Sequence, residues 1–553
     1  MGDETATPRG RAIIQTCAAL KGDRQTYISL CDEISLYFAP EQETLLEVTA
    51  GSEVLQPIIS SGILANQKCQ SGLYSNSMAM GKGNISSNDK RQMEVPIIKE
   101  WYAELSNQTH HHISQSSFPQ SFNKWLTDYV PFGGAVMYLR WDEDTYSHEY
   151  QVFPIGKCFY TFDHLDRVNA MYREYDFTSD QAVGEFGYNQ CPKVVRVAYD
   201  KDDYKTKFGF VHCLRENKKA DPDSKHWSKM QYESLHVHVT TGKLCHESGT
   251  KHFRYIVEHF YQKHGENNGR SPGMQALPVM RTLMKSVSDY IDGTEMAIGP
   301  PMWLSDRDAV ESAILEAFGV NYADLSKGDP WMYKIDANAL RLSSEFIEWL
   351  RSEIDDLFYV PLFTMLEQSK SGAKTAYEVS QMVAERTQAI APIANSLSRF
   401  FRRVYYITAH DLIAAGQITP APEGIEQSDI DVKYTSRLDV RLKEIENVSM
   451  MEAIGQAAET VAAFQQSPEI QAVVRIIPTI ISIFESHNVD PGNIRNQTEA
   501  KKELDGINQA MADAKQEETA AAGLAPIDLA KEPDPNSMLG GMVEAGAGGM
   551  IGQ

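Results

Sequence analysis

The sequence predicts an α+β protein, because the spacing of its apolar residues changes twice along the chain. Over about the first hundred residues and after about residue 279, apolar side chains recur at the intervals typical of amphipathic helices. Between residues 130 and 265 the chain breaks into short β-branched and aromatic runs, separated by Gly, Pro and Asp. Such runs indicate strands and hairpins of a mixed sheet.

The composition limits the classes of partner. The chain has 553 residues, of which 75 are acidic and 52 basic, for a formal net charge of −23. Such a surface repels nucleic acid as a whole, so contact with phosphates needs local basic spots. Seven cysteines without a CxxC pair disfavour a disulfide framework and indicate a reducing compartment. We expect no signal peptide, because the N-terminus "MGDETATPRGRAII" lacks a long apolar core. We expect no membrane partner, because no run of 18 apolar residues occurs.

The first hundred residues are expected to be mostly helical. Apolar residues follow a helical spacing in residues 12–38, 55–78 and 94–107. The first of these stretches ends just before Pro40, as a helix should.

The middle of the chain is expected to form strands. The candidate strands and hairpins are 133–144, 150–163, 167–177, 193–200, 208–216, 234–244 and 252–263.

Two long helices with a small insert between them are expected next. The first spans residues 279–298, about 30 Å at 1.5 Å per residue, and stops at Gly299-Pro300-Pro301. Its apolar positions are Met280, Leu283, Val287, Ile291 and Ile298. After a compact insert to about residue 340, the second helix covers 343–366. Its apolar stripe is Phe346, Leu350, Ile354, Leu357 and Phe358, and Pro361 should kink it.

A basic loop and a third long helix follow. The loop "SKSGAK" contains Lys370, Gly372 and Lys374 in an otherwise acidic chain. The helix begins at Thr375 and runs to about His410, and Thr375 with Glu378 has the spacing of a capping box. Its apolar stripe is Val379, Val383, Ile390, Leu397, Phe401 and Val404. Pro392 lies well inside this helix and should bend it.

The remainder is expected to contain a short strand at 429–436 and then an acidic, helical part. The Gly- and Ala-rich end has few side chains to bury and is expected to be mobile.

No motif for catalysis or metal binding stands out. The sequence has no P-loop, no GxSxG nucleophile motif and no HExxH zinc motif. "HHH" at 110–112 is interpreted as an exposed polar loop rather than a metal site. His236, His238, Cys245 and His246 form a looser group in an expected hairpin, with His236 and His238 on one strand face. Packing or surface roles are favoured there over metal binding, and we expect no cofactor, no metal and no catalytic residue.

The long helix pair suggests assembly. Two long helices that carry a small insert cannot bury all their sides within one chain. Neighbouring copies would cover the rest, and a closed ring of identical subunits does so economically.

The order of these elements, with several local motifs, resembles the portal (head-to-tail connector) proteins of short-tailed, T7-like bacteriophages. The resemblance rests on "YQKHGENNGRSPGMQALPVMRTLMK", "IEWLRSEIDDLFYVPLFTML", "KTAYEVSQMVAERTQAIAPIANSLSR" and "FPIGKCFYTFDHLDRVNAMYREYDFTSDQAVGEFG". In the family the first leads into a stem helix, the second follows the clip, the third is the helix after the tunnel loop, and the fourth belongs to the wing.

The resemblance implies the phage portal fold, assembled as a ring. Its implied parts are a wing at 1–278, a stem helix at 279–299, a clip at 300–341, a second stem helix at 342–366, a tunnel loop at 367–374, a wing return with a kinked helix at 375–440, a helical crown at 441–518 and a tail at 519–553.

The resemblance also implies a function. A dodecameric ring at one capsid vertex of the virion, assembled in the host cytoplasm, would pass double-stranded DNA through its channel. Its implied partners are the major capsid protein, scaffolding protein, a terminase that drives packaging, and tail adaptor and tail proteins. The residues nearest DNA would be Lys370, Ser371, Gly372, Ala373 and Lys374. Met280, Leu283 and Val287 would pack the stem, within a subunit or across subunits.

Two alternatives stay open at the level of sequence. Lys370 and Lys374 could be ordinary solvated loop residues. The whole protein could instead be a soluble α+β enzyme with an unrecognised site in the strand-rich region at 130–265. The mass of the protein in solution separates a ring from such an enzyme.

Overall fold

The structure is a computed structural model. It describes residues 7–40, 59–78, 82–89, 91–221, 224, 226–263, 266–305, 316–323, 331–332, 337–368, 376–422, 430–435 and 502. The chain divides into two compact units, the first made of residues 1–467 and 483–492 and the second of 468–482 and 493–553. Every helix and strand named below belongs to the first unit.

Helices dominate the first 132 residues, whereas the sequence predicted them for about the first hundred. They are α1 (Pro8–Asp23), α2 (Gln25–Phe38), α3 (Ser61–Met78), α4 (Pro96–Gln115) and α5 (Phe118–Phe132), with a short 3₁₀ turn at Gln92–Glu94. Residues 12–38 form two helices rather than one, because Arg24 leaves the helical conformation at φ −93° and ψ 0°. Its guanidinium is buried and donates to the Cys158 carbonyl. The helix α5 was not expected from the sequence.

The core is aromatic where α5 meets the last long helix, α11 (Ala376–Ala414). Trp125 stacks on Phe400 with ring centroids 4.4 Å apart. Phe118 and Phe122 contact Phe401 at 5.8 and 5.0 Å. These rings are fully or almost fully buried, so residues far apart in sequence share one core.

The strand-rich region is confirmed, but the expected mixed sheet is wrong: the longer strands form two sheets, and both are antiparallel. One sheet has the order β3 (Ser147–Phe153), β2 (Gly134–Asp142) and β9 (Tyr255–His259). The other runs in sequence order through β4 (Cys158–Phe162), β5 (Val168–Thr178), β6 (Lys207–Glu216), β7 (Tyr232–His238) and β8 (Leu244–Thr250). Short elements here are β10 (Tyr261–Gln262), β11 (Gly269–Arg270) and 3₁₀ turns at Ile155–Lys157 and Trp227–Lys229.

One expected strand is wrong. Residues 193–200 form the helix α7 (Lys193–Asp200), which follows α6 (Ser179–Phe186) in an insertion between β5 and β6. The three valines favoured a strand, but only Val195 is buried, together with Cys191 and Phe186. Pro192 gives the chain the extended entry to a helix, and packing on α6 overrides the strand propensity.

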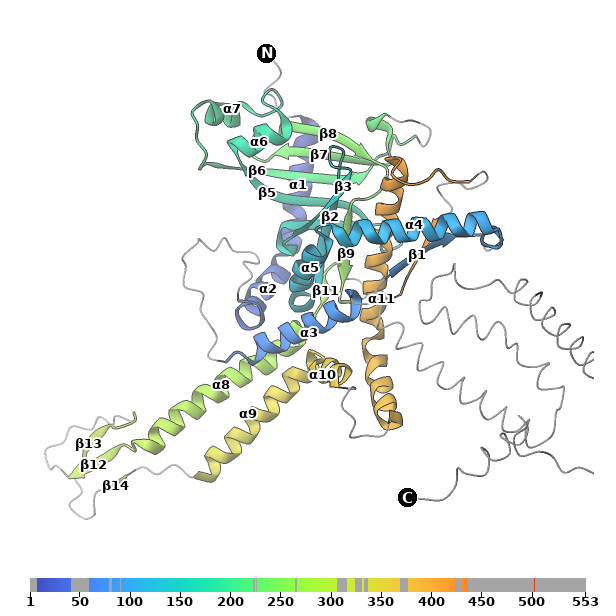
Figure 1. Cartoon of the computed structure of the whole chain (residues 1–553). Coiled ribbons are helices and arrows are strands. Elements are labelled where there is room, and N and C mark those ends of the chain that lie inside the picture. The colour runs from blue at the N-terminus through green and yellow to red at the C-terminus, as the bar shows by residue number, and fades with distance from the viewer. Residues whose placement is uncertain are drawn as a thin grey trace, which may run out of the picture. The chain divides into compact units, whose positions relative to one another are not determined.

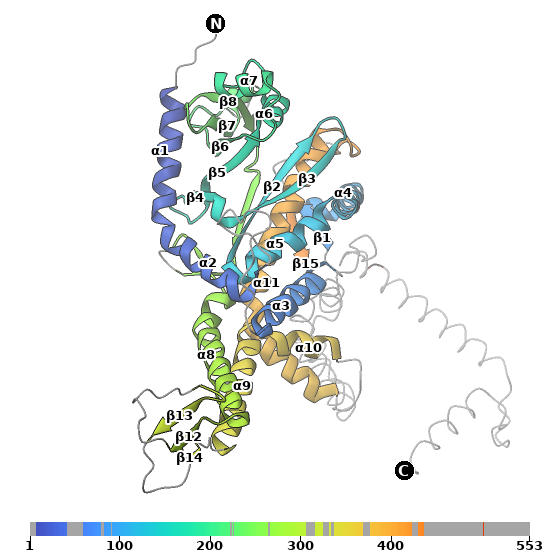
Figure 2. The same ribbon diagram turned by 90° about the vertical axis from the view of Figure 1, so that its left-hand side faces the viewer.

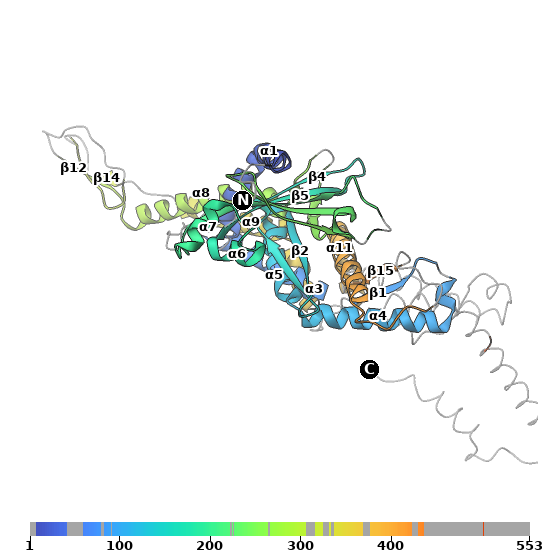
Figure 3. The same cartoon turned by 90° about the horizontal axis from the view of Figure 1, so that it is seen from above.

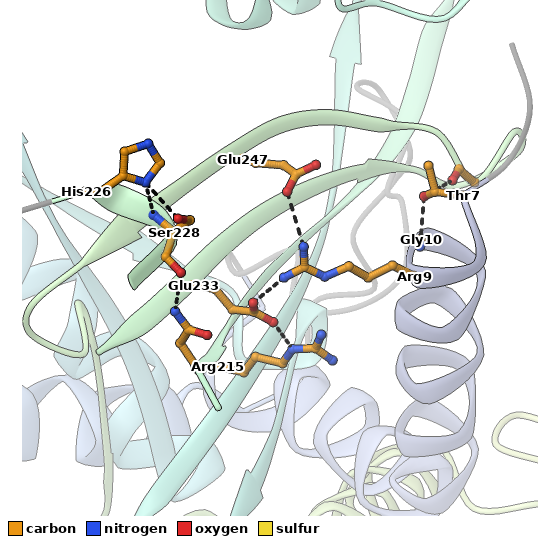
Figure 4. Close-up of polar contacts among 10 residues, drawn as sticks. Thr7, Arg9, Gly10, Arg215, His226, Ser228, Glu233 and Glu247 are labelled. Carbon is orange, nitrogen blue, oxygen red and sulfur yellow. Dashed lines mark hydrogen bonds and ion pairs between the residues drawn. The ribbon is translucent and has the colours of Figure 1, made fainter. Parts of the chain in front are cut away.

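The N-terminal helix α1 covers one face of the five-stranded sheet. Ile13 and Cys17 are buried with Phe159, Val211 and Leu235 of the sheet. At the N-terminal end of α1, Arg9 forms ion pairs with Glu233 of β7 and Glu247 of β8 (Figure 4). Gly10 lies so close to the Gly242 carbonyl that an added Cβ would sit 2.2 Å from its oxygen. The helix is therefore held by apolar packing along its length and by charge at its end.

The long helices agree with the sequence in order but not in every boundary. Between α8 (Pro272–Ile298) and α9 (Ala337–Leu357) lies a small sheet of β13 (Val320–Ala323), β12 (Met302–Ser305) and β14 (Trp331–Met332). The helix α8 begins at Pro272 rather than at 279, because the Ser271 hydroxyl accepts from the Met274 amide at 2.9 Å. In Figures 1 and 3 the α8–α9 pair leads away from the sheets and carries the small strands at its far end.

The second long helix is broken rather than kinked. It ends at Leu357, and α10 (Val360–Gln368) follows with Pro361 in its first turn. Tyr359 has a left-handed φ of 57°, which no continuous helix allows. Proline is well tolerated in a first turn, so it marks the new start instead of bending one helix.

A two-stranded sheet joins distant parts of the chain. The expected strand at 429–436 is present as β15 (Ile430–Thr435), and it pairs antiparallel with β1 (Lys82–Ser87). The β1 strand was missed, because "KGNISS" contains one β-branched apolar residue. Within the described residues, no helix is long and apolar enough to cross a membrane.

Candidate assembly surface

The helix pair α8–α9 is anchored firmly at its base. The Ser271 hydroxyl donates to the Pro131 carbonyl at 2.7 Å, and a Cβ on Gly273 would sit 2.6 Å from that same oxygen. Arg281 pairs with Glu33 of α2 at 2.5 Å. These contacts fix the direction in which α8 leaves the core.

The two helices share a narrow apolar seam. Met280 and Leu283 of α8 are fully buried, and Val287 is half-buried against the same core. On α9 the buried positions are Ile347, Leu350 and Ile354. They recur at three- and four-residue intervals, so one face of α9 meets α8.

The end of α9 is also fixed to the core. Phe358 is fully buried and its ring lies 5.2 Å from that of Phe38 in α2. The Tyr359 and Tyr261 hydroxyls are hydrogen bonded to each other. Phe363 of α10 packs against Gly72 of α3, where an added Cβ would sit 2.3 Å from the ring. The start of α8 and the end of α9 are therefore both anchored to the core of the first unit.

A second face of α9 is apolar but uncovered. Leu342, Phe346 and Trp349 have exposed fractions of 59%, 44% and 57%, and the Phe346 and Trp349 rings stack 5.7 Å apart. The sequence assigned Phe346 to the buried stripe, which is wrong: Ile347, one residue on, takes that place. Because a helix turns by about 100° per residue, neighbouring apolar residues face different sides.

Exposed apolar residues continue to the far end of the helix pair. Ile291 and Ile298 of α8 are exposed, as are Met302 and Val320 of the small sheet. Phe318 is 72% exposed and has a left-handed φ of 61°. Its amide donates to the Gly299 carbonyl at 2.7 Å, and its ring lies over Gly299, where a Cβ would be 2.4 Å away. Exposed aromatic and aliphatic groups on an anchored element are the chemistry of a protein-binding surface.

Comparison with known proteins identifies the family. The model of "Bacteriophage head to tail connecting protein" matches residues 11–492, which include every described helix and strand apart from the first three residues of α1. The chain belongs to this family. Its members are structural, so this protein is a phage portal protein at the portal vertex of the virion and not an enzyme.

Two similar proteins span almost the same length. A "Probable portal protein" of Bordetella phage BPP-1 is 20% identical over 466 residues, covering 80% of this chain and 82% of the relative. A "Portal protein" of Salmonella phage epsilon15 is 22% identical over 559 residues, covering 97% of this chain and 98% of the relative. The enzyme alternative is therefore set aside for this portal protein.

The predicted DNA-facing loop lies outside the described residues. This holds for Lys370, Ser371, Gly372, Ala373, Lys374 and the cap residue Thr375. Glu378 and the stripe residues Val379, Val383 and Ile390 lie in α11, but their side chains are not described. Pro392 is exposed and lies inside the continuous helix α11. The predicted crown and tail, apart from Lys502, are also outside the described residues.

The triple-histidine loop predicted at 110–112 is wrong, because these residues lie in α4. The His110 ring accepts or donates a hydrogen bond with the Tyr405 hydroxyl at 2.6 Å. His112 Nε2 lies 3.4 Å from His148 Nδ1, and burial lowers the pKa of His112 to about 4. The signal was present in the sequence, because Thr109 and Ile113 are buried at helical spacing.

The second histidine group is packed into the sheet. His236 bonds with the Tyr175 hydroxyl at 2.7 Å, and its ring stacks on His212 at 4.1 Å. His238 bonds with Thr241 at 2.9 Å. Burial lowers the pKa of His236 to about 3, so the ring is neutral near pH 7. No group of three or more potential metal ligands occurs in the part of the chain that the structure describes.

All seven cysteines are free and buried. Burial is the largest cause that raises the pKa of Cys17, Cys31 and Cys213 to about 12. These thiols pack as small apolar groups.

The exposed row on α9 was the feature that sequence reasoning missed. Its signal was the spacing of Leu342, Phe346 and Trp349, which is helical but belongs to a different face from Leu350 and Ile354.

Proposed function

We propose that this portal protein forms a closed ring of twelve copies at one capsid vertex, as the T7-like portal proteins that its sequence resembles do. The ring would be the channel for packaging and ejection of double-stranded DNA. It would also be the attachment point for the terminase and the tail. The family match and the length of the two relatives support the comparison over the whole chain.

The observation that carries the ring is the uncovered row of Leu342, Phe346 and Trp349. The other side of α9 packs against α8, whereas these three side chains are exposed in the described part of the chain. A monomeric protein rarely leaves contiguous apolar side chains on an anchored helix in water. In a ring, each contact is heterologous and every copy covers its neighbour's exposed face.

The parts of the ring follow the resemblance. The α8–α9 pair would be the stem and β12–β14 the clip, where tail adaptor proteins bind. The sheets and α1–α5 would be the wing, which faces the capsid and scaffolding proteins. Residues 441–518 would be the crown and 519–553 a tail. Exposed Phe318 and Ile298 at the end of the stem support a protein-binding role for the clip.

The channel would touch DNA at the loop of residues 370–374. Its two lysines are the local basic spot that an acidic chain needs next to phosphates. Each lasting phosphate contact releases counterions and adds affinity, so an otherwise acidic channel keeps DNA free to slide. No chemistry on the DNA is required of the protein.

The ring is tested by removing the uncovered row. The variant L342Q/F346Q/W349Q should remain folded, because all three side chains are exposed. It should fail to form rings, as judged by light scattering and electron microscopy. A matched control, I97Q/L165Q, removes exposed apolar side chains elsewhere and should assemble normally. Normal rings from the triple variant would show that this row is not a subunit contact.

A further inference from the structure

A second exposed apolar surface lies far from the stem. The insertion of α6 and α7 carries exposed Tyr188, Val194, Val197, Tyr199 and Tyr204 within one short segment. Val194 and Val197 are three residues apart, so they share one side of α7 while Val195 faces the core. We call residues 188–207 the α7 lobe. Tyrosines beside aliphatic groups are frequent anchors of protein interfaces.

The lobe is also basic, in contrast to the whole chain. It carries Lys193, Arg196, Lys201, Lys205 and Lys207. In the described structure no ion pair involves these five cations.

The acidic residues of the lobe accept hydrogen bonds from other residues of the lobe. The Tyr188 hydroxyl donates to Asp200 at 2.9 Å, and the Tyr204 hydroxyl donates to Asp202 at 2.9 Å. Asp203 accepts from the Thr206 hydroxyl at 2.6 Å and from two backbone amides. These bonds hold the tyrosines in place and leave the positive charges of the lobe available to a partner.

The turn between β2 and β3 offers the opposite surface. Glu143, Asp144 and Glu149 are exposed, and none of them forms an ion pair in the described part of the chain. Tyr146 is exposed beside them with a left-handed φ of 48°, which is unfavourable for a tyrosine. Asp142 fixes the turn by accepting from the Asp144 amide at 3.1 Å and the Thr145 hydroxyl at 2.6 Å. We call residues 143–149 the acidic turn.

We propose that the α7 lobe of one copy binds the acidic turn of a second copy of this chain. The cations of the lobe would pair with Glu143, Asp144 and Glu149, and Tyr146 would pack among the exposed valines and tyrosines of α7. The lobe and the turn are separate segments in Figures 1 and 2, and Arg140 of β2 pairs with Glu185 of α6 at 3.4 Å. The proposal requires each copy to use both surfaces at once with different neighbours. Such a head-to-tail contact closes into a ring when the rotation between neighbours completes a circle.

This contact rests on the proposed ring and adds a second interface to that of the stem. Opposite charges steer two surfaces into register more than they add affinity, and salt weakens them. The lobe and the turn would therefore set which neighbour is accepted, while the apolar stem supplies most of the buried area.

Exchange of the charges tests this contact. In K193E/K201E/K205E the lobe becomes acidic, and in E143K/D144K/E149K the turn becomes basic. Each variant should raise the protein concentration at half-assembly by about tenfold at low salt, because like charges then face each other. A one-to-one mixture of the two variants should assemble through alternating copies, because each acidic lobe then meets a basic turn and each basic lobe an acidic turn. The combined six-fold variant carries both exchanged surfaces on one chain. It should assemble within about threefold of the wild type.

Controls separate this contact from general charge effects. K124E/K218E/K219E changes the net charge by the same amount outside the lobe and should assemble like the wild type. V194S/V197S, which changes two exposed side chains and no charge, should weaken assembly, and exchange of the turn should not rescue it. Circular dichroism and thermal unfolding verify that each variant is folded.

The outcomes are distinct for the lobe and for the ring. Wild-type rings together with normal assembly of both triple-charge variants would overturn the lobe contact and leave the ring in place. Additive loss in the six-fold variant would also overturn it. A wild type that never assembles would overturn the ring, and the lobe contact with it.

Discussion

The single side chain of Leu283 contributes strongly to the packing of α8. It is fully buried in α8, as is Met280, and both belong to the core that includes the buried face of α9. Thr282, the preceding residue, is exposed, and its hydroxyl donates to the Pro278 carbonyl of its own helix. The direction of the stem helix therefore depends on a few apolar groups rather than on its surface.

Leu283→Asp should destabilise the protein and prevent ring assembly. The substitution buries a carboxylate without a partner, which costs several kcal/mol. Thr282→Asp places the same charge one residue earlier, where it faces water. The free energy of unfolding of this variant should lie within about 1 kcal/mol of the wild-type value. Urea unfolding and light scattering measure both. Wild-type stability and normal rings for Leu283→Asp would mean that this seam is not needed.

Histidines near Asp411 give the protein a dependence on pH. Arg254 and His148 both contact the Asp411 carboxylate, with His148 Nε2 at 2.9 Å. His252 lies beside His410, with ring centroids 4.8 Å apart. Burial lowers the pKa of His112 and of His252 from 6.5 to about 4. The folded protein thus holds these rings neutral where the unfolded chain would bind protons.

Stability should fall as the pH falls from about 6.5 to about 4. A histidine with a lowered pKa in the folded state contributes its full stability above the unfolded pKa and loses it on acidification. In H112Q/H252Q this loss should be smaller, because glutamine does not titrate. Urea unfolding at several pH values compares the two, with the exposed-site variant His226→Gln as a control. If the free energy of unfolding fell equally with pH in the wild type and in H112Q/H252Q, these two histidines would not cause the pH dependence.

At the scale of elements, the periodicity of apolar residues gave the helices and strands but not all of their partners. The strand-rich region and the order α8, small insert, α9 and α11 were predicted, whereas one mixed sheet was expected where the longer strands form two antiparallel sheets. Two errors came from short segments: α7 has three valines but packs as a helix on α6, and β1 has too few β-branched residues to indicate a strand. Tertiary contacts decided both.

The exposed row on α9 could not be predicted from the sequence, for a different reason. Phe346 and Ile347 are adjacent and both apolar, so the pattern alone could not say which one faces α8. The packing of α9 on α8 decides which of the two residues is buried. The helix α8, which contains Leu283, lies more than forty positions earlier in the sequence. The candidate surface therefore emerged only from the measured exposure of each side chain.

Pro392 should bend α11. Proline removes one backbone hydrogen bond and its ring clashes with the preceding turn, although α11 continues through it from Ala376 to Ala414. The part after Pro392 is anchored: the Ser396 hydroxyl donates to the His259 carbonyl at 2.9 Å. The helix axes before and after the proline, measured in an experimental structure of the ring, should differ in direction. A straight α11 would contradict the prediction.

At the scale of the whole molecule, the acidic chain and its basic loop should act together. The variant K370E/K374E should form normal rings, because the sequence predicts that Thr375 and Glu378, rather than the lysines, cap the helix that follows. It should lower the amount of DNA packaged or retained per head. Complementation of a portal-defective phage and the DNA length per particle measure this, with K218E/K219E as a control of equal charge. Full-length genomes at wild-type yield would show that the loop charges are idle.

We expect this portal protein to be complete only as a ring. The mass and shape of the purified full chain test this directly, by light scattering and electron microscopy over a range of concentration and salt. Closed rings with twelve copies of the 62.0 kDa chain, joined along the α8–α9 pair, are expected. A monomer or dimer under every condition would contradict it.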